Sequence, residues 1–149
     1  MSDTRAFRRP GPLERVLNRA IGALVGLGLG PAHMWLLEVR GRKSGRLRVT
    51  PVDLLPSGGR LYLVAPRGDT EWVRNAEASG EVALRRGRRR EAYRLRALSP
   101  AEKPAILAAY LDRFRREVQR YFPVAAGSPS EAFVQLTSRY PAFQLLPRA

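Results

Sequence analysis

The first regular pattern of apolar residues along the chain has the period of an α-helix. Apolar side chains recur every three or four positions over Leu13–Leu24, while Arg15 and Arg19 fall on the other face. This spacing predicts an amphipathic helix over about Pro12–Gly26. Core packing is the usual explanation of such a stripe, and contact with a lipid surface is the alternative. Residues 1–12 are expected to form a flexible N-terminal segment.

From Met34 onward the pattern changes to short runs of β-branched and aromatic residues separated by turn residues. Five such runs have the spacing of hairpins and predict antiparallel strands at Met34–Arg40, Leu47–Leu55, Arg60–Ala65, Glu81–Arg86 and Arg89–Leu98. The turns between them contain glycine, whose backbone adopts a positive φ without strain. A last strand is expected at Ala142–Leu146, after Pro141.

Three further helices are predicted from their capping residues. Asp69 or Thr70 can cap a short helix through WVRNAEAS, which Gly80 would end. The capping box SPAE at residues 99–102 predicts a long helix from about Pro100 to Tyr121. The same signature, SPSE at residues 128–131, opens a helix that reaches about Arg139.

These elements predict an α+β fold in which one barrel-like antiparallel sheet of about six strands is covered by helices. No internal repeat or linker divides the chain. A length of 149 residues with 44% hydrophobic content is enough for one core. Residues 1–149 are therefore expected to form a single domain.

The charge of the chain adds an expectation about ligands. The net charge is +14, and all but two of the 27 cationic residues are arginine. Arginine binds phosphate or carboxylate through two parallel hydrogen bonds, so anionic partners are expected, although a GC-rich genome is the alternative explanation. The chain has no cysteine, which excludes disulfides and Cys-based zinc sites and is compatible with the cytoplasm. The uncharged stretch Ala20–Leu37 is interrupted by glycines and Pro31, which argues against a membrane span.

Side chains for acid–base or nucleophilic catalysis are scarce. The one histidine, His33, has no carboxylate nearby in the sequence, and a structural role is the simpler interpretation. The acidic residues are scattered singly, so no metal site is predicted. No nucleophile elbow, P-loop or dinucleotide fingerprint is present. If the protein is an enzyme, its reactive atoms belong to a cofactor, and no catalytic side chain is assigned.

The segment GRKSGRLR, residues 41–48, is the best candidate for an anion site. Its glycines allow backbone N–H groups to form an anion-binding nest, and further donors come from the side chains of Arg42, Lys43, Ser44 and Arg48. Arg67 can approach if neighbouring loops meet. The longer run Arg85–Arg90 has no interleaved aromatic residues, so it is interpreted as a solvated hairpin tip and no specific nucleic-acid binding is expected.

With these segments in place, the chain resembles the deazaflavin-dependent nitroreductase family, split β-barrel proteins that bind the cofactor F420. The matching segments occur in the family's order: GRKSGRLRVTPV (41–52), GRLYLVAPRG (59–68), WVRNAEASG (72–80) and YPAFQLL (140–146). The resemblance implies a split antiparallel β-barrel with an N-terminal helix, a short helix after the third strand and two C-terminal helices. It implies F420 as cofactor, with FMN as the alternative.

The resemblance also implies roles for particular residues. The implied cofactor-binding residues are Arg42, Lys43, Ser44, Arg48, Pro51, Val52, Pro66, Arg67 and Asn75. Val52 would lie against the ring system, and Pro66 stands where the family has a serine. One branch of the family places tyrosines over the substrate before the last strand. In this chain Phe133 and Tyr140 are the aromatic residues of that region and the predicted substrate contacts.

The activity implied by the resemblance is hydride transfer between reduced F420 and an apolar acceptor such as a quinone, or a nitro or other conjugated compound. A non-catalytic carrier of a flavin, lipid or fatty acid near the membrane is the alternative, which the uncharged stretch Ala20–Leu37 keeps open. A cytoplasmic location is expected. Peripheral membrane contact through the first helix and a homodimer are both left open.

Overall fold

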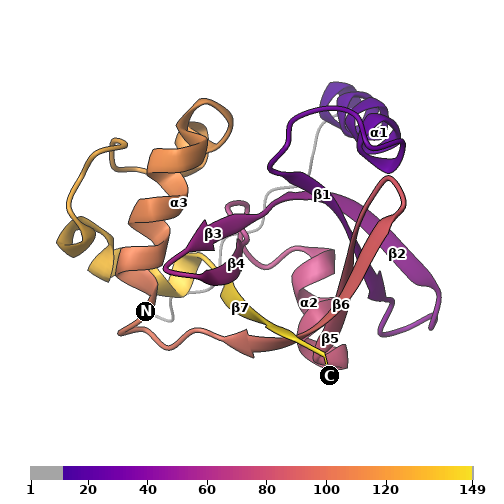
Figure 1. Cartoon of the computed structure of the whole chain (residues 1–149). Helices are drawn as coiled ribbons and strands as arrows, with labels where there is room; N and C mark the ends of the chain where they lie inside the picture. Colours follow the sequence, from indigo (N-terminus) through magenta and orange to yellow (C-terminus); the bar gives the residue numbers. More distant parts are fainter. Residues whose placement is uncertain (1–11, 149) are drawn as a thin grey trace.

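Seven antiparallel strands form one curled sheet in the computed structural model, which describes residues 12–148 (Figure 1). The order of strands across the sheet is β2-β1-β5-β6-β7-β4-β3. Their bounds are β1 Met34–Arg40, β2 Leu47–Asp53, β3 Leu55–Ser57, β4 Arg60–Val64, β5 Glu81–Arg86, β6 Arg89–Ala97 and β7 Ala142–Pro147. The α+β fold with a half-barrel sheet is thus confirmed. Of the segment 1–12 predicted to be flexible, residues 1–11 lie outside the described residues, and Pro12 is the first residue of the first helix.

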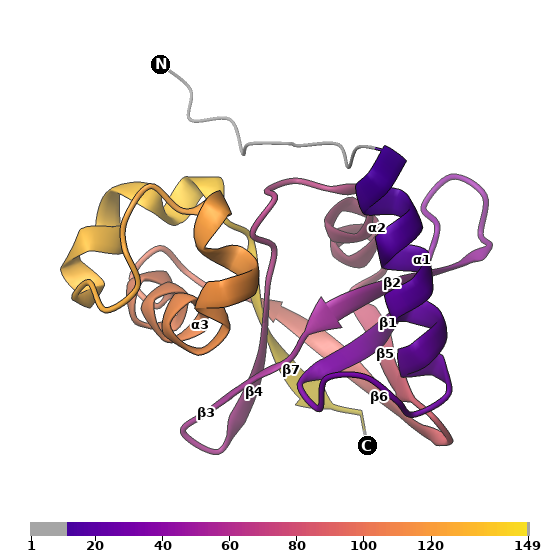
Figure 2. The same ribbon diagram turned by 90° about the horizontal axis from the view of Figure 1, so that it is seen from above.

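The helices cover two sides of this sheet. Helix α1 (Pro12–Gly26) lies beside β1 and β2, and α2 (Glu71–Ser79) packs on β1 and β5 (Figures 1 and 2). Helix α3 (Lys103–Val118), the short turn η1 (Gln119–Tyr121) and η2 (Ser130–Arg139) form a separate layer beyond the β3–β4 hairpin.

One residue, Leu54, carries the chain from one edge of the sheet to the other. The sequence predicted a single strand over Leu47–Leu55, but β2 ends at Asp53 and β3 begins at Leu55 on the opposite edge. Since a single residue joins the two edges, the sheet must curl until they meet. The Leu54 N–H donates to the carbonyl of His33, 2.9 Å away, and fixes this corner.

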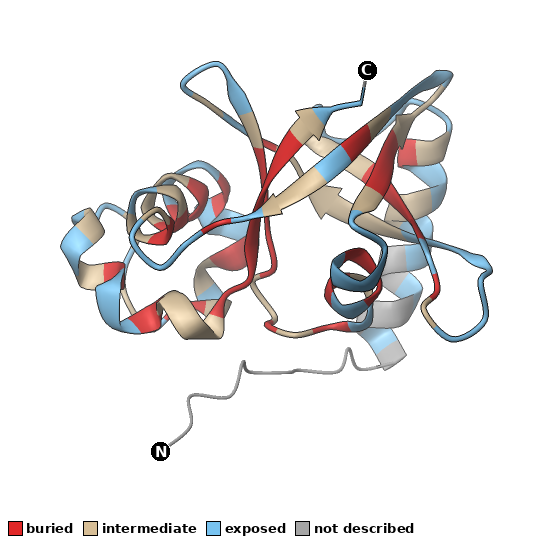
Figure 3. Ribbon diagram, turned by 90° about the horizontal axis from the view of Figure 1, so that it is seen from below, coloured by how far each residue is buried: buried red, intermediate tan, exposed pale blue. Residues whose placement is uncertain are grey.

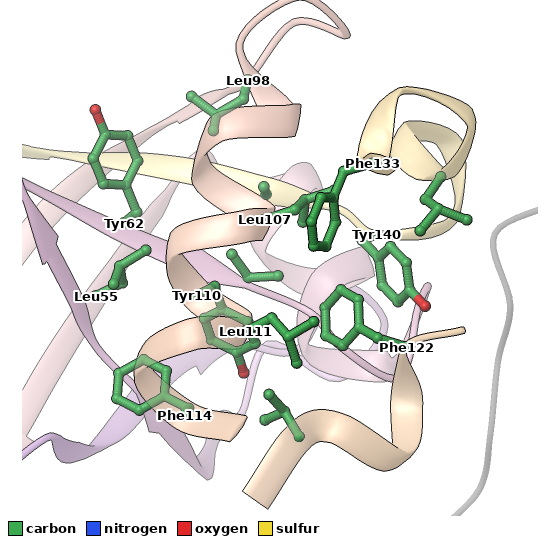
Figure 4. Close-up of a cluster of buried hydrophobic side chains, with 14 residues drawn as sticks. Leu55, Tyr62, Leu98, Leu107, Tyr110, Leu111, Phe114, Phe122, Phe133 and Tyr140 are labelled. Carbon is green, nitrogen blue, oxygen red and sulfur yellow. The ribbon is translucent and has the colours of Figure 1, made fainter. Parts of the chain in front are cut away.

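Buried side chains form two main clusters. One fills the inside of the curled sheet and includes Leu37, Leu63 and Leu84, with Ala76 of α2. The other joins α3 and η2 to the β3–β4 hairpin and contains most of the buried aromatic rings (Figure 4). Figure 3 shows the same division, with buried residues along the strands and on one side of the α3 layer. The cleft described below lies where the two clusters adjoin.

The two capping boxes behave differently. In the first, the Ser99 N–H donates to Glu102 Oε1 at 3.0 Å and the Glu102 N–H to Ser99 Oγ at 3.4 Å, although regular α-helix begins only at Lys103. The second box does not form. The Ser128 N–H bonds to the Ala125 carbonyl in a preceding turn, and the segment that follows is a 3₁₀-helix rather than an α-helix.

The apolar stripe of α1 does not pack in the core as expected. Leu13 is 82% exposed, and Val16 and Leu24 are exposed as well. The helix instead approaches the sheet through glycine: a Cβ at Gly22 would lie 3.8 Å from Leu36 and Pro51. Among the described residues, no helix is both long and apolar enough to cross a membrane.

The arginine run Arg85–Arg90 is partly structural rather than fully solvated. Arg85 and Arg90 pair with the buried carboxylate of Glu38, at 3.2 and 2.7 Å. Arg86 donates to three main-chain carbonyls of the α1–β1 connection at 2.7 to 2.9 Å. The run therefore holds α1 and β1 together.

Arg86→Ala is expected to lower the free energy of unfolding by about 2 kcal/mol, because charge-assisted hydrogen bonds to three carbonyls are lost. Urea denaturation measures this change. The neighbouring Arg88 is exposed, so Arg88→Ala should change stability by less than about 0.5 kcal/mol. Equal effects of the two substitutions would contradict a structural role for Arg86.

Candidate functional site

A cleft of about 850 Å³ lies beside the β2 edge of the sheet. Its walls come from the β1–β2 turn, strand β2, the β4–α2 loop and the C-terminal part of α3 with η1. All nine residues predicted to bind the cofactor line it: Arg42, Lys43, Ser44, Arg48, Pro51, Val52, Pro66, Arg67 and Asn75. The fold thus brings together residues spread over 34 positions of sequence. That they bind the cofactor stays a prediction.

The turn between β1 and β2 is closed by its own hydrogen bonds. The Gly41 N–H donates to the Arg46 carbonyl at 2.8 Å, and the Gly45 N–H to the Gly41 carbonyl at 2.9 Å. Gly45 has φ +72°, and a Cβ at Gly41 would lie only 2.9 Å from Ser44 Oγ. The left-handed backbone at Gly45 therefore favours glycine, whereas a side chain at Gly41 would require Ser44 to move.

The expected backbone nest is largely occupied within the protein. Besides the N–H groups of Gly41 and Gly45, that of Arg42 donates to Asn75 Oδ1 and that of Arg46 to Ser44 Oγ. Four of the main-chain N–H groups that the sequence interpretation offered to an anion are thus engaged within the protein.

Asn75 fastens the turn to α2. Its Oδ1 accepts from the Arg42 guanidinium at 2.8 Å and from the Arg42 N–H at 3.0 Å. The same guanidinium donates to Glu71 Oε2 at 2.9 Å, and this hydrogen bond lowers the pKa of the Glu71 carboxyl below its usual range. Arg42 is thus already paired. Lys43 and Arg48 line the cleft, and no ion pair of theirs is found within residues 12–148.

A residue with a buried hydroxyl, Thr70, lines the cleft at the start of α2. Thr70 is the N-cap residue of this helix, yet its side chain makes no capping hydrogen bond. Its Oγ1 is buried and has no hydrogen-bond partner among the described residues. An unsatisfied buried hydroxyl costs about 1 to 3 kcal/mol, so a ligand that bonds to it gains affinity.

The rest of the cleft is mainly apolar. Pro51 and Val52 of β2 face it, as do Val64, Ala65 and Pro66 at the end of β4. Because β2 is an edge strand, proline is tolerated there without loss of a sheet hydrogen bond. The cleft is therefore cationic at the β1–β2 turn and apolar along β2, the arrangement that suits a long ligand with an anionic end.

The sequence interpretation missed a cluster of titratable side chains at the barrel corner. His33 Nε2 lies 3.3 Å from Asp53 Oδ1 and 3.3 Å from Glu117 Oε1. The Asp53 side chain is 11% exposed, and desolvation, followed by the charge of Glu117, raises its pKa to about 6, against an opposing effect of His33. Within residues 12–148 no other group of histidine and acidic side chains lies so close together.

The two predicted substrate contacts do not line the cleft. Phe133 is 0% exposed and Tyr140 2% exposed, and both pack on Phe122 in the α3 core (Figure 4). The Tyr140 hydroxyl donates to the carbonyl of Tyr121. The reason is that η2 turns its apolar face into this core. The aromatic residues that do line the cleft are Trp72, Tyr110 and Tyr121.

Comparison with known proteins gives one family and several structural relatives. The sequence model of the family described as F420H(2)-dependent quinone reductase matches residues 14–127. A search of curated proteins found no match.

Three solved structures share the fold. One is described as a domain-swapped dimer (20% identity, TM-score 0.55, covering 89% of this chain and 92% of that one). Another is described as an F420-H2 dependent reductase (18% identity, TM-score 0.53, covering 76% of this chain and 94% of that one). The third is described as a FAD-binding protein from Mesorhizobium loti (12% identity, TM-score 0.52, covering 95% of this chain and 93% of that one). At these identities the likeness concerns the fold alone.

Proposed function

The chain belongs to the F420H(2)-dependent quinone reductase family, and on this premise we propose that its cleft binds F420 along β2 and reduces a quinone-like acceptor there. The protein is an F420-dependent oxidoreductase, and FMN is the secondary choice of cofactor. The observation that carries the proposal is that all nine expected cofactor residues line one cleft.

The donor set of the cleft fits F420, which carries a phosphodiester and several carboxylates. Lys43 and Arg48 would hold these anionic groups, with Arg67 beside them and the Thr70 hydroxyl as a further partner. Pro51 and Val52 would form the apolar wall against the ring system. Arg42 and Asn75 would hold the β1–β2 turn in place through their mutual hydrogen bonds, in addition to any contact with the cofactor.

The chemistry itself needs little from the protein. Reduced F420, when bound, supplies a hydride to the acceptor. The residues of the chain bind and orient the two reactants and keep water away from them, and such placement alone can lower a barrier by roughly 7 to 11 kcal/mol. This explains why a cleft with few catalytic side chains suffices for an enzyme.

The lining favours a flat apolar acceptor. Trp72 and Tyr121 face the cleft, together with the aliphatic side chains of β2 and β4. Aromatic and aliphatic walls suit a conjugated ring system such as a quinone. These residues replace Phe133 and Tyr140 as the proposed substrate contacts.

Anaerobic mixing of the purified protein, reduced F420 and a soluble quinone tests the proposal. We expect F420H2 to be oxidised at a rate proportional to protein concentration, which the return of F420 absorbance measures. No reaction is expected when reduced FMN or NADPH replaces F420H2. A rate no greater than that without protein would contradict the proposed activity.

The family match does not favour the non-catalytic carrier. Homodimerisation and a cytoplasmic location with peripheral membrane contact remain proposals. Their support is the exposed apolar face of α1, with Leu13 and Val16, and for the dimer also the structural relative described as one. Light scattering during gel filtration measures the oligomeric state, and sedimentation with vesicles of anionic lipid measures membrane contact.

A further inference from the structure

The cluster at the barrel corner joins two hollows of the protein. Asp53 and Glu117 line the large cleft, whereas His33 lines a second hollow of about 250 Å³ together with Trp35, Arg113 and others. His33 Nε2, 3.3 Å from Asp53 Oδ1, is the contact between them. The imidazole is held against the ring of Phe114, with centroids 4.9 Å apart. A chain of two titratable groups thus runs from the second hollow into the cofactor cleft.

The fold places Asp53 at the end of β2 that lies away from the β1–β2 turn. It is the last residue of β2, and Arg48 lies five residues before it, roughly 16 Å away at the rise of an extended strand. A ligand whose anionic groups meet Lys43 and Arg48 and whose body follows β2 therefore leads toward Asp53.

The two facing atoms are unsatisfied. His33 Nε2 and Asp53 Oδ1 are both buried, and neither has a well-aligned hydrogen bond to any described residue. Buried polar atoms are nearly always paired in folded proteins, so an exception requires an explanation. Function is one such explanation, because the two atoms lie 3.3 Å apart, close enough for a proton to pass between them.

We propose that Asp53 is the general acid that completes reduction of the acceptor and that His33 returns the proton to it from solvent. This proposal rests on the proposed function. An acceptor that has gained a hydride has two electrons and one proton and still lacks a second proton. The O–H bond of the Asp53 carboxyl breaks, its proton forms the new O–H bond on the acceptor, and the electron pair stays on Asp53 as carboxylate. That carboxylate regains a proton from His33 Nε2, and the imidazole takes up a proton from water at its other ring nitrogen, Nδ1.

The charges around Asp53 support this role. Burial and the charge of Glu117 raise its pKa to about 6, while His33 opposes the shift. Tyr110 of α3 faces the same carboxylate, and burial, then the charge of Asp53, raise the pKa of its hydroxyl well above the usual value. A general acid is most effective when its pKa lies near the working pH, where the protonated form is still populated.

The first test is the pH dependence of quinone reduction. The wild-type rate should fall as pH rises through about 6, since Asp53 then loses its proton. Asp53→Asn should lower the rate at pH 5.5 by about a hundredfold or more and remove this pH dependence. Its affinity for F420 should stay unchanged. Glu131→Gln, which removes an exposed carboxylate outside the cleft, should leave rate and profile as in the wild type.

Two neighbouring substitutions should move the pH profile in opposite directions. Glu117→Gln removes a charge that raises the pKa of Asp53, so the profile should shift to lower pH. His33→Gln removes an opposing effect, so the profile should shift to higher pH. The same shifts should be visible in a carboxyl ¹³C NMR titration of the cofactor-free protein.

A stability measurement separates this role from a merely structural one. The folded-state pKa of Asp53 lies above the ordinary value of 3.8, so its contribution to stability is complete below 3.8 and is lost as pH rises through about 6. Asp53→Asn should therefore raise the urea midpoint at pH 8, and this gain should vanish near pH 4. A structural ion pair predicts the reverse, a loss of stability at pH 8.

Three outcomes would overturn the inference. The first is an ordinary pKa for Asp53, and the second is an Asp53→Asn variant that binds F420 and keeps the wild-type rate and profile. The third is a stoichiometric metal ion whose removal by a chelator abolishes activity. The second outcome leaves the proposed function intact, whereas failure of the wild-type protein to bind F420 would overturn both.

Discussion

Replacing Lys43 and Arg48 together by alanine is expected to raise the dissociation constant of F420 by about a hundredfold or more. Both side chains line the cleft and form no ion pair with other described residues, so in the proposed complex their charges are available to the ligand. A charge-assisted hydrogen bond is worth about 1.5 to 3 kcal/mol, and 1.4 kcal/mol is a factor of ten in affinity. Both side chains are solvent-exposed, so the lower end of this range applies to each.

A charge-matched control distinguishes local contacts from the general positive field. Arg88 and Arg94 are exposed and lie outside the cleft lining, so replacing both by alanine removes the same charge elsewhere. This control variant should bind F420 with nearly wild-type affinity at 0.15 M salt, where exposed charges are screened beyond about 8 Å. If the two double variants lose affinity equally, the β1–β2 turn is not the anion site.

Phe133→Ala is expected to lower the free energy of unfolding by about 3 to 5 kcal/mol, the usual cost of removing a buried phenylalanine ring. Its ring is fully buried in the α3 core, where it packs edge-on against Phe122 with centroids 6.2 Å apart (Figure 4). Urea denaturation measures the change. The protein that remains folded should bind F420 and reduce quinone at the wild-type rate, because Phe133 does not line the cleft.

Val134 provides the matched control, since it is the next residue of η2 and is 53% exposed. Val134→Ala should change stability by less than about 0.5 kcal/mol. Loss of activity in Phe133→Ala without loss of stability would show instead that Phe133 contacts the substrate, as the sequence suggested.

The elements that could be predicted from the sequence are those with strictly local signals. Helix α1 and strand β1 have the predicted bounds, because a 3.6-residue apolar period and a bounded apolar run specify each by itself. The corner at Leu54 could not be predicted, because the sequence on both sides has strand character and only the distant pairing with β4 ends β2. The expectation that the apolar stripe of α1 packs in the core was wrong for a related reason. The period of the stripe indicates a helix but does not say which element covers its apolar face.

The candidate site divides in the same way. Residues 41–52 lie on one hairpin, so the spacing of glycine and cationic residues was enough to point to one wall of the cleft. Asn75 was predicted as a ligand, but its position under Arg42 depends on how α2 packs. The group of His33, Asp53 and Glu117 comes from three separate elements, up to 84 positions apart, and no local spacing could have brought them together.

The most direct test of the account is a titration of the purified protein with F420, in which binding is measured as quenching of the cofactor's fluorescence. We predict saturable binding of one F420 per chain at micromolar cofactor, weaker binding of FMN, and loss of saturation in the Lys43→Ala/Arg48→Ala variant. Absence of F420 binding to the wild-type protein at micromolar concentrations would contradict it.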